Sequence, residues 1–513
     1  AMCPTAIHTP TAGEPPLLEV TKLVRYPLPS VPEPVLLGGT LRVVVDAPPT
    51  AGNWSLWLDS EFGRLQLHLI NSSYVEGDGW VLHLRVPEGI YPALYDLDLK
   101  FLRDGVEESY TQPRSVWVLR EWPRRLLIGH ITDIHLPYGA DVLARCVYEL
   151  NLIHPDLVLV TGDVVDIDTV ASGWRYYQQI MGWLEVPSYV LPGNHDHAGD
   201  NATNYQRFCG PLYYAVKVGR FLIVALDTME AGYVTKSQLR WAEKVLKEHP
   251  DEVKILGIHH PLFIQGGAIN GSWSQIDQLK ELLYSSWREH INEAQEFLRL
   301  IETYDVRLVL AGHIHRDLNV LYNGRCYFIT KNPSGGSLPW GCYQSYGLVE
   351  VDCEGRVRVH TYAGKDLFNT PNSIPIGQLT YYYAPVNDGS SAAVSVAIIN
   401  NQTQPLENLR LTFLTSLKHP VEDYRFYPRS PSRFEVVTTD KGHLFIAYVN
   451  VSAQSGLYLT LAAIQDSAKP SIGVEVVGDI REGVPITLLI RASDGGWGVR
   501  GVHVEYSTDG GLS

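Results

Sequence analysis

The fold of the central part of this 513-residue chain follows from one stretch, Leu126-Leu127-Ile128-Gly129-His130-Ile131-Thr132-Asp133-Ile134-His135. Its first three residues form a short apolar run, which is typical of a strand buried on both faces. Its last three residues carry a carboxylate and an imidazole. A buried strand that ends in such side chains predicts the carboxyl edge of an α/β sheet, where binding sites form.

The same pattern of an apolar run followed by polar residues recurs along the next 180 residues. Stretches of helical period separate the apolar runs, and the longest of them extends from Ile276 to Tyr304. Strands that alternate with helices predict an α/β domain with a layered sheet. The polar motifs that follow the later strands are Gly162-Asp163-Val164-Val165-Asp166, Gly193-Asn194-His195-Asp196, His259-His260-Pro261 and Gly312-His313-Ile314-His315.

The five motifs share one type of chemistry. They offer carboxylate, imidazole and amide donors and no thiolate, a set that suits zinc, manganese, iron or nickel. One Asp-x-His or His-x-His alone is a weak signal, because most such pairs are solvated loops or satisfied core residues. Five motifs in order, each at the end of a predicted strand, indicate a metal site.

This ordered set resembles the calcineurin-like metallophosphoesterase superfamily, and the resemblance covers roughly residues 124–366. It implies a centre of two divalent or trivalent metal ions (Mn, Fe, Zn or Ni). His260 is the alternative to His259 in the His-His-Pro motif. The implied ligands are Asp133, His135 and His315 for the first metal, Asn194, His259 and His313 for the second, and Asp163 as the bridge between them.

The resemblance also implies a reaction, in which a hydroxide that bridges the two metals attacks phosphorus. His195 matches the general acid of the superfamily, and Asp166 matches the carboxylate that orients it. We therefore expect an enzyme that hydrolyses small phosphate esters, and we favour a broad phosphomonoesterase. A phosphodiesterase acting on cyclic nucleotides or glycerophosphodiesters is the alternative. An adhesion or structural protein of the cell surface with a vestigial phosphoesterase domain is the alternative from another class.

The regions on either side of the α/β part alternate apolar and polar residues and contain frequent turn residues. This pattern predicts β-sandwiches of roughly immunoglobulin type. The predicted architecture is therefore multidomain, with a central α/β metallophosphoesterase sandwich flanked by all-β domains. The expected parts are a tail (1–16), a β-sandwich (17–122), the catalytic domain (123–368), a second β-sandwich (369–467) and the start of a further, truncated β module (468–513).

Composition narrows the partners and the location. The net charge of −15 makes nucleic acid an improbable partner, and no run is long and apolar enough to span a membrane. The six Asn-x-Ser/Thr triplets favour an exported glycoprotein at the cell surface, with an anchor conceivable beyond residue 513. Cys326, Cys342 and Cys353 lie close enough in sequence for a disulfide, with separate thiols as the alternative. The oligomeric state stays open.

Overall fold

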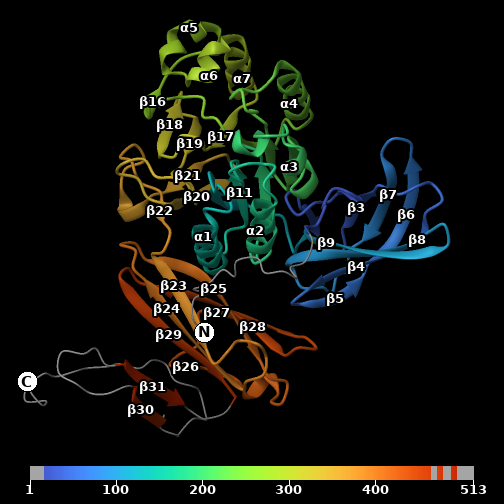
Figure 1. Cartoon of the computed structure of the whole chain (residues 1–513), viewed down its shortest axis with the longest axis vertical. Helices are drawn as coiled ribbons and strands as arrows, with labels where there is room; N and C mark the ends of the chain where they lie inside the picture. The colour runs from blue at the N-terminus through green and yellow to red at the C-terminus, as the bar shows by residue number, and fades with distance from the viewer. Residues whose placement is uncertain (1–16, 464–470, 478–486, 494–513) are drawn as a thin grey trace, which may run out of the picture. The chain divides into compact units, whose positions relative to one another are not determined.

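The computed structural model describes residues 17–463, 471–477 and 487–493. The chain divides into two compact units, one that runs to Gln378 and one that begins at Leu379 (Figure 1). The predicted tail at 1–16 lies outside the described residues. Of the predicted last module, the structure describes one antiparallel pair, β30 (Ser471–Val477) and β31 (Thr487–Ser493).

Two sheets form the centre of the first unit. One has the strand order β12-β11-β10-β20-β21, and β22 pairs with β20 at its side. The other has the order β13-β14-β15-β17-β19-β18-β16. Strands β10 to β12 are parallel to one another, as are β14, β15, β17 and β19. The strands are β10 (Arg125–Ile131), β11 (Leu157–Thr161), β12 (Ser188–Leu191), β13 (Tyr214–Val218), β14 (Phe221–Ala225), β15 (Val253–Gly257), β16 (Gly267–Ile269), β17 (Val306–Ala311), β18 (Leu318–Tyr322), β19 (Cys326–Thr330), β20 (Ser345–Asp352), β21 (Val357–His360) and β22 (Ile374–Pro375).

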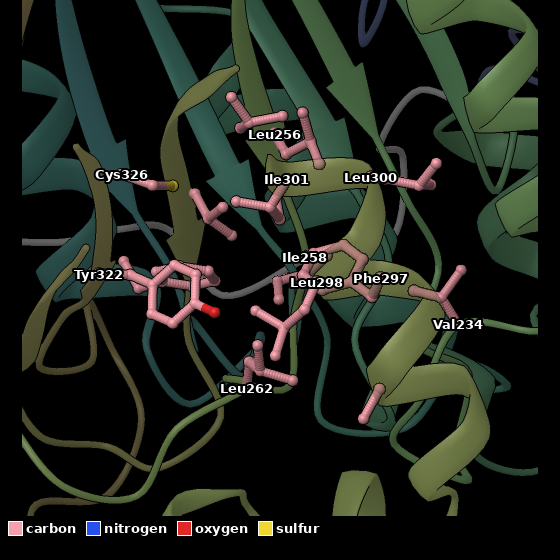
Figure 2. Close-up of a cluster of buried hydrophobic side chains, with 14 of the residues drawn as sticks. Val234, Leu256, Ile258, Leu262, Phe297, Leu298, Leu300, Ile301, Tyr322 and Cys326 are labelled. Atoms are coloured by element: carbon pink, nitrogen blue, oxygen red, sulfur yellow. The ribbon is translucent and has the colours of Figure 1, made fainter. Parts of the chain in front are cut away.

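The two sheets pack face to face, and helices cover their outer faces. Alternation along the strands divides the side chains between layers, so that Leu159 and Ile255 lie between the sheets whereas Val160 and Leu256 face helices. Figure 2 shows the outer core of the second sheet, where residues of α7 pack near strand residues. The principal helices are α1 (Ala140–Ile153) and α2 (Ala171–Met181) on the first sheet, with α4 (Lys236–Glu248) and α7 (Ile291–Thr303) on the second.

The predicted long helix from Ile276 to Tyr304 is broken in the structure. It consists of α5 (Ile276–Leu279), α6 (Ser285–Glu289) and α7, with extended backbone at Leu283. The buried Leu283 forms an isolated bridge with Phe263, and the amide of Tyr284 donates to the carbonyl of Leu262 at 2.8 Å. Tertiary pairing therefore overrides helical periodicity here, and it fixes the position of Tyr284.

Sheet-rich regions lie on both sides of the catalytic region, as predicted, although their assignment to the immunoglobulin class stays a prediction. The N-terminal region has two sheets, with strand orders β1-β3-β7-β6 and β2-β9-β8-β4-β5. Its strands are β1 (Val24–Tyr26), β2 (Glu33–Leu36), β3 (Thr40–Val45), β4 (Gly52–Ser60), β5 (Gly63–Gln66), β6 (His68–Val75), β7 (Gly79–Arg85), β8 (Leu94–Arg103) and β9 (Val106–Leu119).

The second unit also contains two sheets, with strand orders β23-β24-β29-β26 and β25-β28-β27. Its strands are β23 (Leu379–Ala384), β24 (Ala393–Asn400), β25 (Leu406–Thr415), β26 (Arg425–Tyr427), β27 (Arg433–Thr438), β28 (His443–Val451) and β29 (Ser455–Ala462).

The N-terminal region shares its packing with the catalytic sheets. Val31 and Trp117 belong to the same buried cluster as the side chains between those two sheets. The guanidinium of Arg114 is buried and donates to the carbonyls of Leu184 at 2.9 Å and Val186 at 2.7 Å, in the loop before β12. Burial lowers the pKa of Arg114 to about 10. This region is therefore part of the catalytic core and not a loosely tethered module.

Two further expectations concern thiols and membranes. Cys326, Cys342 and Cys353 are free, as are the two other cysteines in the part of the chain that the structure describes. The alternative of separate thiols therefore holds for these three residues. Within the described residues, no helix has the length and apolar character needed to cross a bilayer.

Candidate metal centre

All seven predicted ligands lie in loops that directly follow strands of the two sheets. Asp133 and His135 follow β10, and Asp163 and Asn194 follow β11 and β12. The remaining predicted ligands, His259, His313 and His315, follow β15 and β17 of the second sheet. Because parallel strands end at the same edge, this arrangement brings the seven side chains together.

The backbone of this centre is unusual. Five predicted ligands have a left-handed conformation, with φ of 51° at Asp133, 55° at His135, 52° at Asp163, 73° at His313 and 52° at His315. Residues other than glycine rarely adopt this region, and such conformations are concentrated at functional sites. The cost is of the order of 1 kcal/mol or more at each residue. The surrounding fold therefore imposes these conformations.

Glycines in the motifs allow the loops to approach each other closely. A Cβ on Gly312 would lie 1.9 Å from the Thr132 hydroxyl oxygen, and a Cβ on Gly193 would lie 2.2 Å from Asp163 Oδ1. Both contacts are far too short for a real side chain. Glycine at these positions thus lets loops from both sheets meet at the two carboxylates.

One half of the centre is built around Asp133. His315 Nε2 lies 3.4 Å from Asp133 Oδ1 and 3.1 Å from His135 Nε2. The amide of His313 donates to both oxygens of Asp133, at 3.0 and 2.9 Å. The carboxylate therefore links the two sheets, and a backbone amide of the second sheet holds it in position.

The other half is built around Asn194. Its side-chain Oδ1 lies 3.1 Å from His259 Nε2 and 2.9 Å from His313 Nδ1. Asp163 lies between the two halves, with Oδ2 3.2 Å from His259 Nε2 and 3.7 Å from His135 Nε2. This is the place that a bridging carboxylate would occupy.

The outer nitrogens of these imidazoles show which ring atoms face the centre. His259 Nδ1 lies 2.7 Å from the carbonyl oxygen of Thr161, and His315 Nδ1 lies 2.7 Å from that of Ser337. A carbonyl can only accept, so each Nδ1 donates its hydrogen, and Nε2 is the ring nitrogen that each side chain turns toward the centre.

His135 is oriented in a similar way by a carboxylate. Its Nδ1 lies 3.2 Å from Asp166 Oδ1, so Nε2 also faces inward. His313 has its Nε2 2.9 Å from the hydroxyl of Tyr284, and its Nδ1 faces Asn194. Tyr284 belongs to no motif, and its position depends on the helix break described above.

The donor set therefore fits metal ions. Nitrogen and oxygen donors face one another across 2.9–3.4 Å, distances at which a shared proton or a metal ion can lie between them. Donors bound to one ion at about 2.0–2.2 Å would be separated by roughly 3.0–3.5 Å. The potential metal-binding groups include Asp133 with His135 and His315, and Asp133 with Asp163 and His259.

The carboxylates and imidazoles of the centre shift one another's pKa values. Burial alone would raise the pKa of the Asp163 carboxyl, but the imidazoles around it, His259 foremost, hold that pKa well below its usual range. Burial would lower the pKa of His259, yet the Asp163 carboxylate outweighs it and raises the pKa to about 9. Burial, together with His259, lowers the pKa of His313 to about 4. Asp163 is therefore an anion throughout the neutral range.

His195, the predicted general acid, lies at the edge of the centre with its side chain 38% exposed. Its Nδ1 lies 2.7 Å from the backbone carbonyl of Asp166 and 3.7 Å from the carboxylate Oδ1. Asp166 thus contacts both His135 and His195, but its closest contact with His195 comes from the main chain. The amide of His195 donates to Asp163 Oδ1 at 2.8 Å.

His260 lies against the centre behind His313. Its ring centroid is 3.8 Å from that of His313, and its Nδ1 lies 2.9 Å from the Thr228 hydroxyl. Burial lowers the pKa of His260 well below its usual value. His259 makes the contacts with Asp163 and Asn194, and its assignment as the ligand stays a prediction.

Asp196 is a positioning residue that lies within the Gly193-Asn194-His195-Asp196 motif and was not predicted to have a role. Its buried carboxylate accepts from the amides of Gly193 at 2.8 Å, Val164 at 3.1 Å and Val165 at 3.0 Å. Burial and the neighbouring charge of Asp163 raise its pKa to about 6. It ties the loop of Asn194 to the loop of Asp163, and its place directly after His195 was the available signal.

Comparisons with known proteins agree with this geometry. A family model described as calcineurin-like phosphoesterase matches residues 126–317. A probable glycerophosphodiester phosphodiesterase of Arcobacter nitrofigilis is 28% identical over 214 residues, covering 39% of this chain and 71% of that protein. A 3′,5′-cyclic-nucleotide phosphodiesterase of Nostoc sp. is 28% identical over 225 residues, covering 39% of this chain and 78% of that protein.

Among solved structures, a purple acid phosphatase from yellow lupin seeds aligns with a TM-score of 0.39 and 12% identity, covering 70% of this chain and 69% of that chain. The family match and the curated relatives confirm the resemblance that the five motifs indicated.

Proposed function

Since this chain carries a calcineurin-like phosphoesterase domain at residues 126–317, and is thus a metallophosphoesterase, we propose that its substrates are small phosphodiesters. The support is that the curated relatives named above are a glycerophosphodiester phosphodiesterase and a cyclic-nucleotide phosphodiesterase. The relatives therefore support the phosphodiesterase alternative more than the phosphomonoesterase favoured from the motifs. The alternative of an adhesion protein with a vestigial domain has no support in these comparisons.

In this proposal Asp133, His135 and His315 hold one metal ion, whereas Asn194, His259 and His313 hold a second. Asp163 binds both. Two bound cations supply an activated water and neutralise charge on the phosphoryl oxygens. The observation that carries the assignment is that His259 and His315 each turn Nε2 toward a carboxylate of the centre, while a backbone carbonyl occupies Nδ1.

The residues of the chain supply the remaining chemistry. The Asp166 carbonyl accepts the hydrogen of His195 Nδ1, so Nε2 is the ring nitrogen left for contact with a substrate. In its protonated form His195 can give the Nε2 proton to the oxygen of the departing alcohol. The His195 amide also holds Asp163 Oδ1, which leaves Oδ2 free to face the ligand imidazoles.

A substrate pair tests the proposal. We expect kcat/KM for bis-p-nitrophenyl phosphate to exceed that for p-nitrophenyl phosphate by about tenfold or more, in protein loaded separately with manganese, zinc, iron or nickel. Cyclic adenosine monophosphate and glycerophosphoethanolamine are the second set of substrates. A preference for the monoester under every metal would return the assignment to a phosphomonoesterase. No turnover of any ester in protein that holds two metals would revive the vestigial-domain alternative.

We also propose that the protein is exported. The asparagine of each Asn-x-Ser/Thr triplet is exposed, which leaves all six accessible to a glycosyltransferase. Enzymatic deglycosylation of protein from its native source should lower its mass. An unchanged mass would remove this support.

A further inference from the structure

The two most exposed large hydrophobic side chains of the described residues both border the candidate metal centre. Trp340 is 102% exposed and Tyr138 is 80% exposed. Single exposed apolar residues are common on protein surfaces and need no explanation. Tyr138 and Trp340 differ from such single residues because they lie on neighbouring loops at the same site.

Both loops are anchored to predicted ligands. The amide of Tyr138 donates to the carbonyl of His135 at 3.0 Å. Trp340 follows Ser337, whose carbonyl oxygen lies 2.7 Å from His315 Nδ1. Three residues of extended chain span at most about 11 Å, so Trp340 lies within reach of the centre.

The two loops also contact each other. The amide of Gly336 donates to the carbonyl of Asp133 at 2.7 Å. A Cβ on Gly139 would lie 2.8 Å from the Cα of Gly335. The backbone next to Tyr138 is therefore packed against the backbone that leads to Trp340, so the two loops that carry these rings are in contact.

The loop holds Trp340 in an exposed position by its backbone. The amide of Cys342 donates to the carbonyl of Pro339 at 3.1 Å, and Gly341 has a φ of 80°. These are the features of a type II turn with Trp340 at its first central position, where the side chain points away from the fold. Leu338, two residues before Trp340, is also exposed.

We propose that Tyr138 and Trp340 form an aromatic rim that binds a planar aromatic group of the ester substrate, such as a nucleobase. This inference rests on the proposed function. Aromatic side chains bind such groups through ring faces and need no enclosed pocket. A lipid surface is the less favoured occupant, because a chain with a net charge of −15 is repelled by anionic membranes.

The test uses two diesters that release the same leaving group. The p-nitrophenyl ester of thymidine 5′-phosphate carries a nucleoside, and methyl p-nitrophenyl phosphate does not. Stacking is worth about 1–3 kcal/mol, so Trp340→Ala should lower kcat/KM for the nucleoside ester about tenfold more than for the methyl ester. Trp340→Phe should retain most of the preference, and Tyr138→Ala should lose part of it.

Trp183 provides a matched control. It is 43% exposed and precedes β12, at the opposite edge of the sheet from the centre. Trp183→Ala should leave both rates unchanged. Binding of thymidine 5′-monophosphate, followed by tryptophan fluorescence, should weaken in Trp340→Ala and not in Trp183→Ala.

The outcomes separate the inference from the proposed function. If the wild type hydrolyses neither diester with metals bound, the proposed function fails. If it hydrolyses both and Trp340→Ala leaves their ratio unchanged, the aromatic rim fails alone. Suppose that Trp340→Ala leaves the ratio of kcat/KM for the two diesters unchanged but abolishes binding to phosphatidylcholine–phosphatidylglycerol vesicles. The aromatic rim would then be overturned in favour of a lipid surface. Loss of a dimer in sedimentation, again with an unchanged ratio, would overturn it in favour of a second copy of the chain.

Discussion

The two sheets of the catalytic region contribute different chemistry to one centre. Loops of the sheet that contains β10, β11 and β12 carry every predicted oxygen donor, together with His195. Loops after β15 and β17 supply imidazoles alone. We infer that negative charge, bridging and proton transfer depend on the first sheet, whereas the second completes the affinity for metal. The two kinds of loop should therefore fail in different ways when mutated.

The largest effect should come from Asp163 of the first sheet. Asp163→Ala removes the anion that faces imidazoles of both halves, so kcat should fall by on the order of 10³-fold or more. Metal content should fall with it, and added metal should not restore turnover. The measurements are hydrolysis of bis-p-nitrophenyl phosphate and metal analysis. Asp163→Asn, which keeps the shape, serves as the control for folding, and full activity with two metals in Asp163→Ala would disprove the bridge.

His195 should show an effect that depends on the leaving group. General acid catalysis contributes about 10²–10⁴-fold, and p-nitrophenolate leaves readily without a proton. His195→Ala should therefore cost far more with an alkyl diester than with bis-p-nitrophenyl phosphate, with metal content unchanged.

Asp166→Asn should show the same pattern more weakly, because the carbonyl that contacts His195 remains. If His195→Ala loses the same activity with both leaving groups, His195 binds the phosphate and does not donate a proton. Loss of a metal from His195→Ala would place it among the ligands.

A predicted ligand from the second sheet should respond differently. His259→Ala removes one imidazole and leaves the carboxylates in place, so the metal concentration needed for half-maximal activity should rise by about 100-fold. Saturating metal should restore much of the turnover. Titration of metal-free protein measures this, with His259→Gln as a second variant should the alanine variant fold poorly. Turnover that stays lost at saturating metal would remove the distinction between the sheets.

The smallest effect concerns pH and stability on the first sheet. His130 is buried on β10, and burial lowers its pKa to about 3. The unfolded chain then binds a proton below about pH 6.5 while the folded chain does not, so stability is lost as pH falls from there toward 3. When the pH is lowered from 7.5 to 5, the free energy of unfolding of the metal-free wild type should fall by about 2 kcal/mol more than that of His130→Gln. Equal losses in urea unfolding would show that His130 is not the cause.

Much of the centre could be predicted because its residues follow apolar strands in short motifs. Asp133, Asp163 and His313 are of this kind, and their spacing after a strand end is visible in the sequence. The carbonyls that orient His259 and His315 could not be predicted, because a main-chain oxygen has no sequence signature. Tyr284 could not be predicted either, since its position depends on a tertiary pairing that interrupts an otherwise helical pattern.

The ester class was the least predictable feature. Monoesters and diesters present the same phosphoryl group to the same donors, so motifs such as Gly312-His313-Ile314-His315 do not distinguish them. The discriminating contacts fall on exposed loops such as the turn at Trp340, which have no periodic pattern. The flanking regions illustrate a related limit, because two stretches with similar strand patterns belong to different compact units.

The contacts of Arg114 limit which segments of this chain can be exchanged by recombination. Its guanidinium donates hydrogen bonds to carbonyls in the loop before β12. Val31 and Trp117 belong to the apolar layer between the catalytic sheets. A version that began at Arg124 would expose that layer and leave two buried carbonyls without donors. The stretch that recombination could exchange intact is therefore about residues 17–378, so the N-terminal strands and the enzyme would have to be inherited together.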